Sequence, residues 1–326
     1  MGSNPNLISV IIPTHNRAPL LISAIESVLM QENACIEIII VDDNSTDNTR
    51  EEIFEIRKNL PDDKQISYYY VRFNSSQKAR NYGLKKSCGE FVQFLDSDDL
   101  LGEQKFYDAL NEFARIPSTD IVFCKCQKFQ GKQSDANFQR MILADFNEEA
   151  TVSNAIVNGV WTASPIFRRN LLEKVGKWDE NLPNLQDKDY ISRAIMYARN
   201  VVTIDRVQAY MRNHSGSRIS GKQFGHEDGI KSVAFIALKF ISIINCEYES
   251  KFRKQAQRLL NRQLIGALMY SRIFEHQSLY DELCEKLSNE KFSIIILFKL
   301  HFIMQAPLYF LHFMMHLWRL IKKVKY

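Results

Sequence analysis

Apolar and polar positions alternate in blocks along the first hundred residues. The runs 7–12 (LISVII) and 36–41 (IEIIIV) are rich in β-branched residues, and polar residues follow each of them, which predicts two buried strands. The stretch 19–31 carries apolar residues at helical spacing, and Pro19 suits the first turn of a helix. The stretch 44–60 begins with Ser, Thr and Asp as candidate helix caps and continues as an amphipathic helix. Strand, helix, strand and helix in this order predict a right-handed βαβ unit with parallel strands, and hence an α/β fold.

A third apolar run, residues 91–95 (FVQFL), leads directly into the acidic segment DSDD at 96–99. In open parallel sheets, ligands bind beyond the carboxyl ends of the strands. The polar segments that follow the three runs (PTHN, DDNS and DSDD) are therefore expected to converge on one edge of the sheet. No G-x-G-x-x-G follows the first run and no G-x-x-x-x-G-K-[ST] occurs anywhere, which argues against a nicotinamide enzyme or a P-loop NTPase.

The aspartates of the DSDD segment form a candidate metal site. Asp96 and Asp98 are two residues apart, so they lie on the same side of an extended chain. Hard carboxylate oxygens suit Mg²⁺ or Mn²⁺, which often bind through one or two carboxylates together with substrate phosphates. Such a cation would supply the counter-charge that a bound diphosphate needs where no glycine-rich loop is present. A solvated acidic turn is the alternative interpretation of the same residues.

Composition narrows the class of protein. The 326 residues, 45% hydrophobic and 25% charged, are typical of a globular chain with one large core or two smaller ones. A net charge of +4 is too small for a dedicated nucleic-acid binder, so no nucleic-acid partner is expected. Six cysteines without regular spacing predict neither a disulfide framework nor a cysteine metal site, and the N-terminal residues resemble no export signal. These features favour a cytoplasmic location.

The last hundred residues have a helical pattern, and residues 291–326 are the most hydrophobic part of the chain. Residues 300–318 contain no formal charge and approach the length of a transmembrane helix. Their polar residues nevertheless fall on one helical face, which predicts an amphipathic helix lying in the membrane surface, with lysines at anionic headgroups. A helix packed on its own domain or on a partner subunit is the alternative. The polar face comprises His301, Gln305, His312, His316, Arg319 and Lys323, and the lysines are Lys322, Lys323 and Lys325.

Five segments occur in the order and spacing of one known family. They are ISVIIPTHNR, IIIVDDNSTDNT, KARNYGL, GEFVQFLDSDD and GKWDENLPNLQDKDY, and they resemble the family 2 glycosyltransferases over residues 7–220. The resemblance implies the GT-A fold, a Rossmann-like and mainly parallel sheet flanked by helices, and inverting transfer from a nucleotide sugar. We therefore expect a GT-A domain at 1–225, with a nucleotide-binding half (1–100) and an acceptor half (101–225), and then a membrane-associating helical region at 226–326.

The resemblance also implies which residues hold the nucleotide. In similar enzymes, the loop after the first strand and the second aspartate after the second strand bind the nucleobase and ribose, and a carboxylate at Asp43 suits the imide N–H of uracil. Asp96 is then expected at the ribose with Ser97 beside it, and Asp98 at the metal, while Asp99 caps the following helix. The loop after the first strand contributes Pro13, His15 and Asn16.

Three further positions are matched to the family. Arg80 and Asn81 fit its A-R-N-x-G segment, whose arginine lies near the nucleotide; a helix-surface arginine is the alternative for Arg80. Asn74 is a weaker nucleotide contact, because the segment before Arg80 is one residue shorter than in the family and lacks its glycine. His214 lies in a stretch similar to one that closes over the diphosphate, which implies a metal ligand or a phosphate contact. A loop histidine without such a role is the alternative.

Asp187 and Asp189 begin a predicted helix and are the candidates for the catalytic base. Inverting transfer needs one general base to deprotonate the acceptor hydroxyl as it attacks the anomeric carbon. In the family, an acid at the position of Asp187, commonly preceded by glutamate, does this work, so Asp187 is favoured although Gln186 replaces that glutamate. Carboxylates are also stabilised at any helix N-terminus by the helix dipole, which is the structural alternative for both residues.

The sequence thus predicts an inverting, Mn²⁺- or Mg²⁺-dependent hexosyl- or N-acetylhexosaminyltransferase. The donor is expected to be a UDP-linked sugar, and the acceptor a saccharide hydroxyl, lipid-linked if the membrane helix is correct, as in a polyprenyl-diphosphate oligosaccharide of a bacterial surface polysaccharide such as O-antigen. The protein would then lie at the inner face of the cell membrane. A nucleotidyltransferase, or a catalytically silent partner in a polysaccharide assembly complex, is the alternative. The sequence does not define the sugar, the acceptor hydroxyl or the oligomeric state.

Overall fold

The computed structural model describes residues 6–129, 160–212, 231–237, 239–240, 264–265, 267–268, 271, 281 and 285. The chain divides into two compact units, one formed by 1–181 with 186–216 and the other by 182–185 with 217–326. In the second unit, residues 231–237 are helical, and the Ser232 hydroxyl accepts a hydrogen bond from the Asn184 N–H at 3.3 Å. The predicted domain boundary at 225 and the predicted membrane helix at 292–326 lie outside the described residues.

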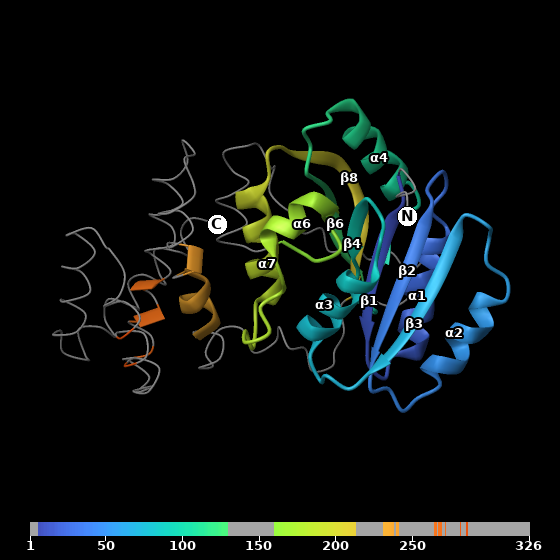
Figure 1. Ribbon diagram of the computed structural model, residues 1–326, viewed down its shortest axis with the longest axis horizontal. Helices are drawn as coiled ribbons and strands as arrows, with labels where there is room; N and C mark the ends of the chain where they lie inside the picture. Colours follow the sequence, from blue (N-terminus) through green and yellow to red (C-terminus); the bar gives the residue numbers. More distant parts are fainter. Residues whose placement is uncertain are drawn as a thin grey trace. The chain divides into compact units, whose positions relative to one another are not determined.

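A single eight-stranded sheet forms the centre of the first unit, in the order β3-β2-β1-β4-β7-β6-β8-β5 (Figure 1). The four strands β1 to β4 are parallel to one another, and the isoleucine, valine and phenylalanine side chains of β1, β2 and β4 are buried because helices cover both faces. The two predicted strands and their parallel pairing are therefore confirmed. These four strands are β1 (Ile8–Thr14), β2 (Ile36–Asp43), β3 (Lys64–Val71) and β4 (Phe91–Phe94).

The other half of the sheet is mixed. The short strand β7 is antiparallel to both β4 and β6, so β6 runs in the same direction as β4. The strands β6 and β8 are parallel, with an irregularity at Lys125, and β5 pairs with the end of β8 in antiparallel fashion. The bounds are β5 (Leu100–Leu101), β6 (Ile121–Phe129), β7 (Ile166–Arg168) and β8 (Val201–Arg212).

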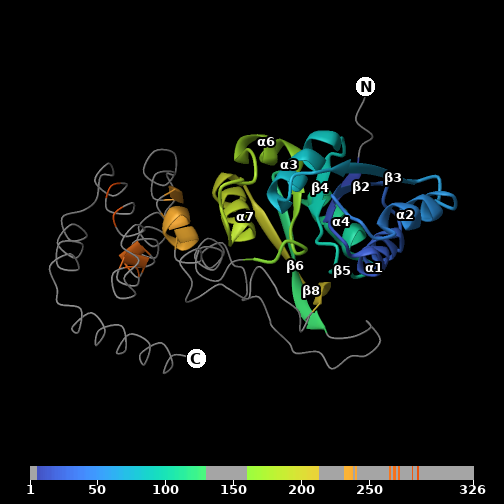
Figure 2. The ribbon, with the colours of Figure 1, turned by 90° about the horizontal axis from the view of Figure 1, so that it is seen from below.

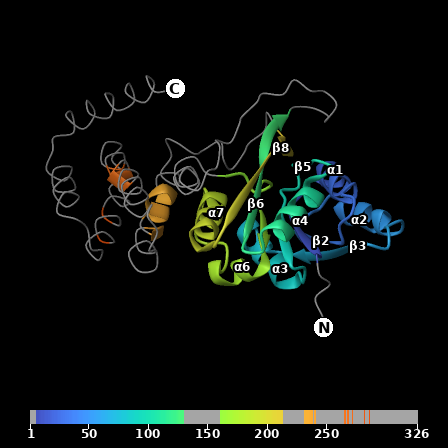
Figure 3. The ribbon, with the colours of Figure 1, turned by 90° about the horizontal axis from the view of Figure 1, so that it is seen from above.

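Helices cover both faces of the sheet (Figures 2 and 3). One face carries α1 (Ala18–Leu29), α2 (Thr49–Arg57) and α4 (Lys105–Arg115), and the other carries α3 (Ser76–Lys86), α6 (Arg169–Val175) and α7 (Gln186–Tyr197). Helix α3 packs closely on β1 at Gly83. A Cβ added at this position would lie only 2.5 Å from Ile11 Cγ2. Within the stretch 44–60, residues 44–48, which include the predicted cap candidates, form the loop after β2, and the predicted helix follows them as α2.

No helix in the described part of the chain is long and apolar enough to span a membrane.

Candidate active site

The carboxyl ends of the parallel strands form one edge of the sheet, and an asparagine with a left-handed backbone lies just beyond three of them. Asn16 follows β1 (φ 50°), Asn44 follows β2 (φ 70°) and Asn74 follows β3 (φ 49°). Asparagine tolerates positive φ better than most residues. These asparagines therefore shape the loops of this edge. The sequence motifs did not indicate such a role for Asn44 or Asn74.

The loops after β1 and β2 are joined by His15 and Asn16. His15 Nδ1 lies 2.7 Å from the Asp43 carbonyl oxygen, which can only accept, so Nδ1 carries the proton. His15 Nε2 then accepts from Asn16 Nδ2 at 3.1 Å, and Asn16 Oδ1 accepts from the Thr46 N–H at 2.7 Å. Pro13 lies next to these residues, near the end of β1. The four residues predicted to hold the nucleobase and ribose thus lie together.

Asp43 organises the loop that leads into α3. Its buried carboxylate accepts three backbone N–H groups, from Phe73 at 2.6 Å, Asn74 at 2.9 Å and Ser75 at 2.7 Å. Ser75 is itself the N-cap of α3. A carboxylate offers about four lone-pair sites, so one further donor such as an imide N–H is compatible with these bonds. Nucleobase contact by Asp43, and nucleotide contact by Asn74, stay predictions.

Arg80 is a buried guanidinium beside the DSDD segment. It is 6% exposed, its Nη2 donates to Asp96 Oδ1 at 2.6 Å, and its Cζ lies 4.6 Å from the centre of the Trp178 ring. Its Nε and Nη1 find no hydrogen-bond acceptor among the described residues. Buried donors without acceptors are costly, so these two groups favour an anionic ligand or water at this point. The alternative of a helix-surface arginine is wrong.

The DSDD segment is surrounded by cationic and backbone donors. Arg17 Nη1 donates to Asp98 Oδ2 at 2.9 Å, and Ser97 between the two acids is 4% exposed. The backbone N–H of Arg212 donates to Asp99 Oδ1 at 3.1 Å. The side-chain Nε of Arg212 donates to the Asp98 carbonyl oxygen at 3.2 Å. The end of β8 is therefore attached to this segment.

The expectation that Asp99 caps a helix is wrong. Strand β5 follows Asp99 directly, and α4 begins later, after Gln104. Because β5 pairs with β8, the Asp99 carboxylate comes to lie against the last residue of β8 instead. His214, the second predicted metal ligand, lies outside the described residues.

The chemistry of Asp98 fits a divalent cation. The described residues contain no group of three or more histidine, cysteine or acidic side chains that could hold a metal by themselves. Mg²⁺ and Mn²⁺, however, commonly bind through one or two carboxylates and complete their shell with substrate phosphates and water. Asp98 is a partly exposed carboxylate, 17% exposed, that already holds one cationic group. It could therefore serve as the protein ligand of a metal that arrives with a diphosphate.

Asn81 fixes the segment 178–180 against α3. Its Oδ1 accepts from the Trp178 N–H at 2.8 Å, and its Nδ2 donates to the Trp178 carbonyl at 3.0 Å and to Glu180 Oε1 at 2.9 Å. Both ends of the amide are thus used within the protein. Direct nucleotide contact by Asn81 stays a prediction.

Asp187 differs from Asp189 in its surroundings. Burial raises the pKa of the Asp187 carboxyl and the charge of Asp96 raises it further, while the Lys188 N–H and Arg80 oppose the shift. Asp187 is therefore within electrostatic reach of both Asp96 and Arg80. Asp189 is fully buried and paired with Arg193 at 2.7 Å. This pairing gives Asp189 a structural role and leaves Asp187 as the better candidate for the base.

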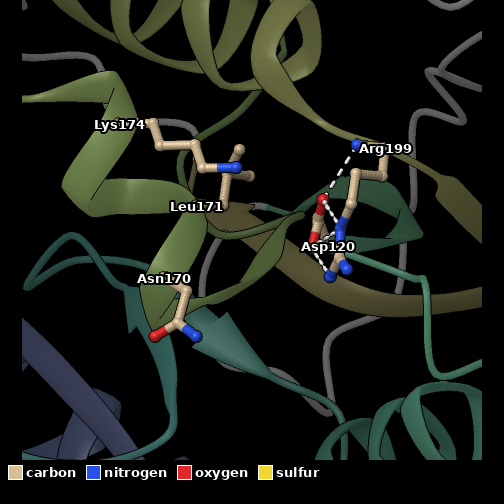
Figure 4. A pocket seen from close by; sticks show the side chains of 5 residues that line it. All are labelled: Asp120, Asn170, Leu171, Lys174 and Arg199. Atoms are coloured by element: carbon tan, nitrogen blue, oxygen red, sulfur yellow. Dashed lines mark hydrogen bonds and ion pairs between the residues drawn. The ribbon is translucent and has the colours of Figure 1, made fainter.

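A small hollow of about 210 Å³ lies elsewhere on the unit (Figure 4). Three of its five lining residues lie on α6, and the other two lie just before β6 and β8, where the Asp120 carboxylate pairs with Arg199 at 2.6 Å. These are the amino ends of strands that run parallel to β4, so the hollow lies at the edge opposite to the DSDD segment. It is not part of the candidate site. Its lining comprises Asp120, Asn170, Leu171, Lys174 and Arg199.

Comparison with known proteins decides the family. The model of glycosyl transferase family 2 matches residues 9–176, just over half of the chain, and this span contains the Arg80 and DSDD segments. The chain belongs to glycosyl transferase family 2. The resemblance seen in the sequence motifs is therefore confirmed.

Relatives of this family 2 protein include longer chains. Poly(ribitol-phosphate) beta-N-acetylglucosaminyltransferase TarS of Staphylococcus aureus (strain MW2) is 27% identical over 261 residues, which are 78% of this chain and 44% of TarS. An uncharacterized glycosyltransferase of Rickettsia typhi is 27% identical over 267 residues, 79% of this chain and 74% of that protein. The chain thus spans less than half the length of TarS.

Solved structures share the fold. The crystal structure of S. aureus TarS 1-349 in complex with UDP-GlcNAc has a TM-score of 0.65 and 23% identity, over 80% of this chain and 79% of that one. The mannosyltransferase PcManGT from Pyrobaculum calidifontis, in complex with GDP-Man and Mn²⁺, has a TM-score of 0.57 and 18% identity, over 82% and 75%. The expected GT-A architecture is therefore confirmed.

Proposed function

We propose that this family 2 protein is an inverting glycosyltransferase that uses a nucleoside-diphosphate sugar, with UDP as the favoured nucleotide. The observation that carries the proposal is the buried Arg80, which pairs with Asp96 and keeps two hydrogen-bond donors without partners in the described structure. A diphosphate supplies the acceptors and the negative charge that such a group requires. The TarS structure with UDP-GlcNAc and the PcManGT structure with GDP-Man and Mn²⁺ support the same class of donor.

The family resemblance assigns roles to the remaining residues, and their positions at the sheet edge support this assignment. Pro13, His15, Asn16 and Asp43 hold the nucleobase and ribose, with Asp96 and Ser97 at the ribose. Asp98 holds Mn²⁺ or Mg²⁺, which supplies positive charge to the departing diphosphate when it is bound. Arg80 offsets the same charge from the protein side. His214 is the second candidate ligand, as the similarity of its stretch to the family's segment implies.

Asp187 is proposed as the general base. It takes the proton of the acceptor hydroxyl as that oxygen attacks the anomeric carbon from the face opposite the diphosphate, so the configuration inverts without a covalent enzyme intermediate. A raised pKa brings a carboxylate closer to the operating pH and makes it a better base in the transition state.

The proposed acceptor is a hydroxyl of a saccharide, in the form of a polyprenyl-diphosphate-linked oligosaccharide in bacterial surface polysaccharide synthesis. The hydrophobic and polar pattern of residues 292–326 supports a location at the inner face of the membrane, where such an acceptor would lie. The name of TarS supports an N-acetylhexosamine as the transferred sugar. The family match disfavours a nucleotidyltransferase, and the presence of Asp43, Asp96, Asp98 and Asp187 disfavours a silent assembly partner.

The test is nucleoside diphosphate release from a panel of UDP- and GDP-sugars with added Mn²⁺. We expect Asp98→Asn to lower Mn²⁺-stimulated turnover by about 10²–10³-fold, the loss that removal of one electrostatic stabiliser commonly causes. Asp62→Asn is the matched control, because Asp62 is an exposed acid just before β3, at the opposite edge of the sheet. Unchanged Mn²⁺ stimulation in Asp98→Asn would make the metal assignment wrong. Nucleotide binding without turnover of any sugar would favour the silent partner.

A further inference from the structure

Arg17 reaches across the candidate site to the proposed metal ligand. It precedes α1, and its carbonyl oxygen accepts hydrogen bonds from the Leu20 and Leu21 N–H groups at 3.0 and 2.9 Å. Its backbone is therefore fixed by the first turn of the helix. Its side chain is 44% exposed, and its guanidinium donates to Asp98 Oδ2 at 2.9 Å, across 81 positions of sequence. A fixed backbone with an exposed side-chain end allows the guanidinium to leave this contact without unfolding the loop.

Arg17 completes the charge balance of the DSDD segment. Asp96 is paired with Arg80, and Asp99 accepts the backbone N–H of Arg212. Asp98 pairs with the Arg17 guanidinium. Without these partners, three carboxylates within four positions would repel one another strongly. A divalent cation bound to the Asp98 carboxylate would compete with the Arg17 guanidinium for Oδ2.

We propose that Arg17 is a built-in counter-ion for Asp98 that competes with the divalent cation and is displaced when the cation binds. The inference rests on the proposed function, namely on Asp98 as the metal ligand. Competition for one carboxylate weakens the binding of a free cation. A cation that arrives with a nucleoside diphosphate gains additional ligands from the phosphates and displaces Arg17 more readily. Arg17 would thereby favour the metal and nucleotide together over the metal alone.

The solvent exposure of Arg17 sets how strongly its pair with Asp98 weakens metal binding. Ion pairs with one half-exposed partner are weak, because water and salt screen them and the side chains lose freedom. Loss of the Arg17 pair is therefore expected to tighten metal binding by roughly two- to fivefold rather than by orders of magnitude. A weak pair suits a group that must be displaced in every catalytic cycle.

The experiment is Mn²⁺ titration of the full-length protein without nucleotide, with free Mn²⁺ followed by electron paramagnetic resonance. Arg17→Gln should lower the Kd for Mn²⁺ by roughly two- to fivefold, whereas Arg17→Lys, which keeps the charge, should stay near the wild-type value. Arg115→Gln is the matched control, because it removes the same charge from an exposed pair with Glu112 on α4. In an Asp98→Asn background, Arg17→Gln should have no effect. Thermal melting of each variant confirms that it is folded.

The outcomes separate the two proposals. If Asp98→Asn abolishes Mn²⁺ binding but Arg17→Gln binds Mn²⁺ no more tightly than wild type, the counter-ion role of Arg17 is overturned and the metal site stands. If Arg115→Gln lowers the Kd for Mn²⁺ as much as Arg17→Gln does, the lower net charge of the protein explains the tighter binding, and the counter-ion role of Arg17 is again overturned. Mn²⁺ binding that survives Asp98→Asn would instead overturn the metal assignment, and the role of Arg17 with it.

Discussion

The Asp187 carboxyl is partly buried and lies near the negative charge of Asp96, and the loss of solvent and this charge both raise its pKa. A general base works only when deprotonated, so kcat/KM should fall as the pH drops through this raised pKa. We expect an acid limb in the pH profile of donor turnover that lies above the ordinary titration range of an aspartate. Asp187→Asn should lower turnover by about 10²–10⁴-fold and remove the limb.

Asp189→Asn is the contrasting variant for this measurement. Asp189 is fully buried against Arg193, and removal of one partner of a buried ion pair commonly costs about 3–5 kcal/mol of stability. This variant should melt at a lower temperature while the acid limb persists in the folded protein. An acid limb that persists in Asp187→Asn would exclude Asp187 as its source.

The sequence motifs predicted which residues gather at the site, but not what many of their side chains do. Arg80 and Asp96 were assigned from the motifs, and the structure brings them into contact. The bonds of Asn81 to Trp178 and of Arg17 to Asp98 join residues 97 and 81 positions apart. No local pattern encodes such pairs, because they depend on how strands distant in sequence pair in the sheet. Asp43 illustrates the same limit, since its three backbone donors lie in a loop about thirty residues further on.

At the scale of elements, an aromatic stack joins α3 to the helix that begins beside the proposed base. The Trp178 ring stacks on Tyr190 of α7 with centroids 4.3 Å apart and planes 5° apart. Arg80 of α3 covers the Trp178 ring at 4.6 Å, and Phe94 of β4 contacts Trp178 edge-on at 5.1 Å. Since Asp187 is three residues before Tyr190, the stack connects the position of Arg80 to that of the base. We therefore expect Trp178 to act as a positioning residue.

Replacement of Trp178 should affect both donor binding and turnover. Trp178→Leu removes the ring under Arg80, a cation–π contact worth about 0.5–2 kcal/mol, so kcat/KM for the donor should fall by roughly two- to thirtyfold. Trp178→Phe keeps a ring and should retain most of the activity. Steady-state donor kinetics on the folded protein, with melting curves for both variants, make the comparison. A Leu variant that is less stable but kinetically unchanged would show that Trp178 only fills space.

The sequence predicted strands correctly where burial on both faces of the sheet determines the pattern of apolar residues. The runs at 7–12 and 36–41 became β1 and β2 because continuous β-branched residues suit strands covered on both faces. The helix after β2 begins only at Thr49, because Asp42 and Asp47 accept the backbone N–H groups of Ser45 and Thr49 and hold a loop first. The two-residue strand β5 has no periodicity of its own, and its pairing with the end of β8 is fixed by tertiary structure alone.

At the scale of the whole molecule, the described residues of the candidate site all belong to the first compact unit, whereas residues 292–326 belong to the second. If this segment is an amphipathic membrane helix, its deletion should release the protein from membranes and leave donor hydrolysis largely intact. The measurement is co-sedimentation with vesicles that contain anionic lipids, together with diphosphate release from the donor.

Replacement of Lys322, Lys323 and Lys325 by glutamine should weaken sedimentation in the full-length chain and make it less salt-dependent, because each lysine near an anionic surface contributes about 1 kcal/mol. Sedimentation that is unchanged by the deletion would contradict the membrane helix, and lost hydrolysis would show that the segment supports the first unit instead.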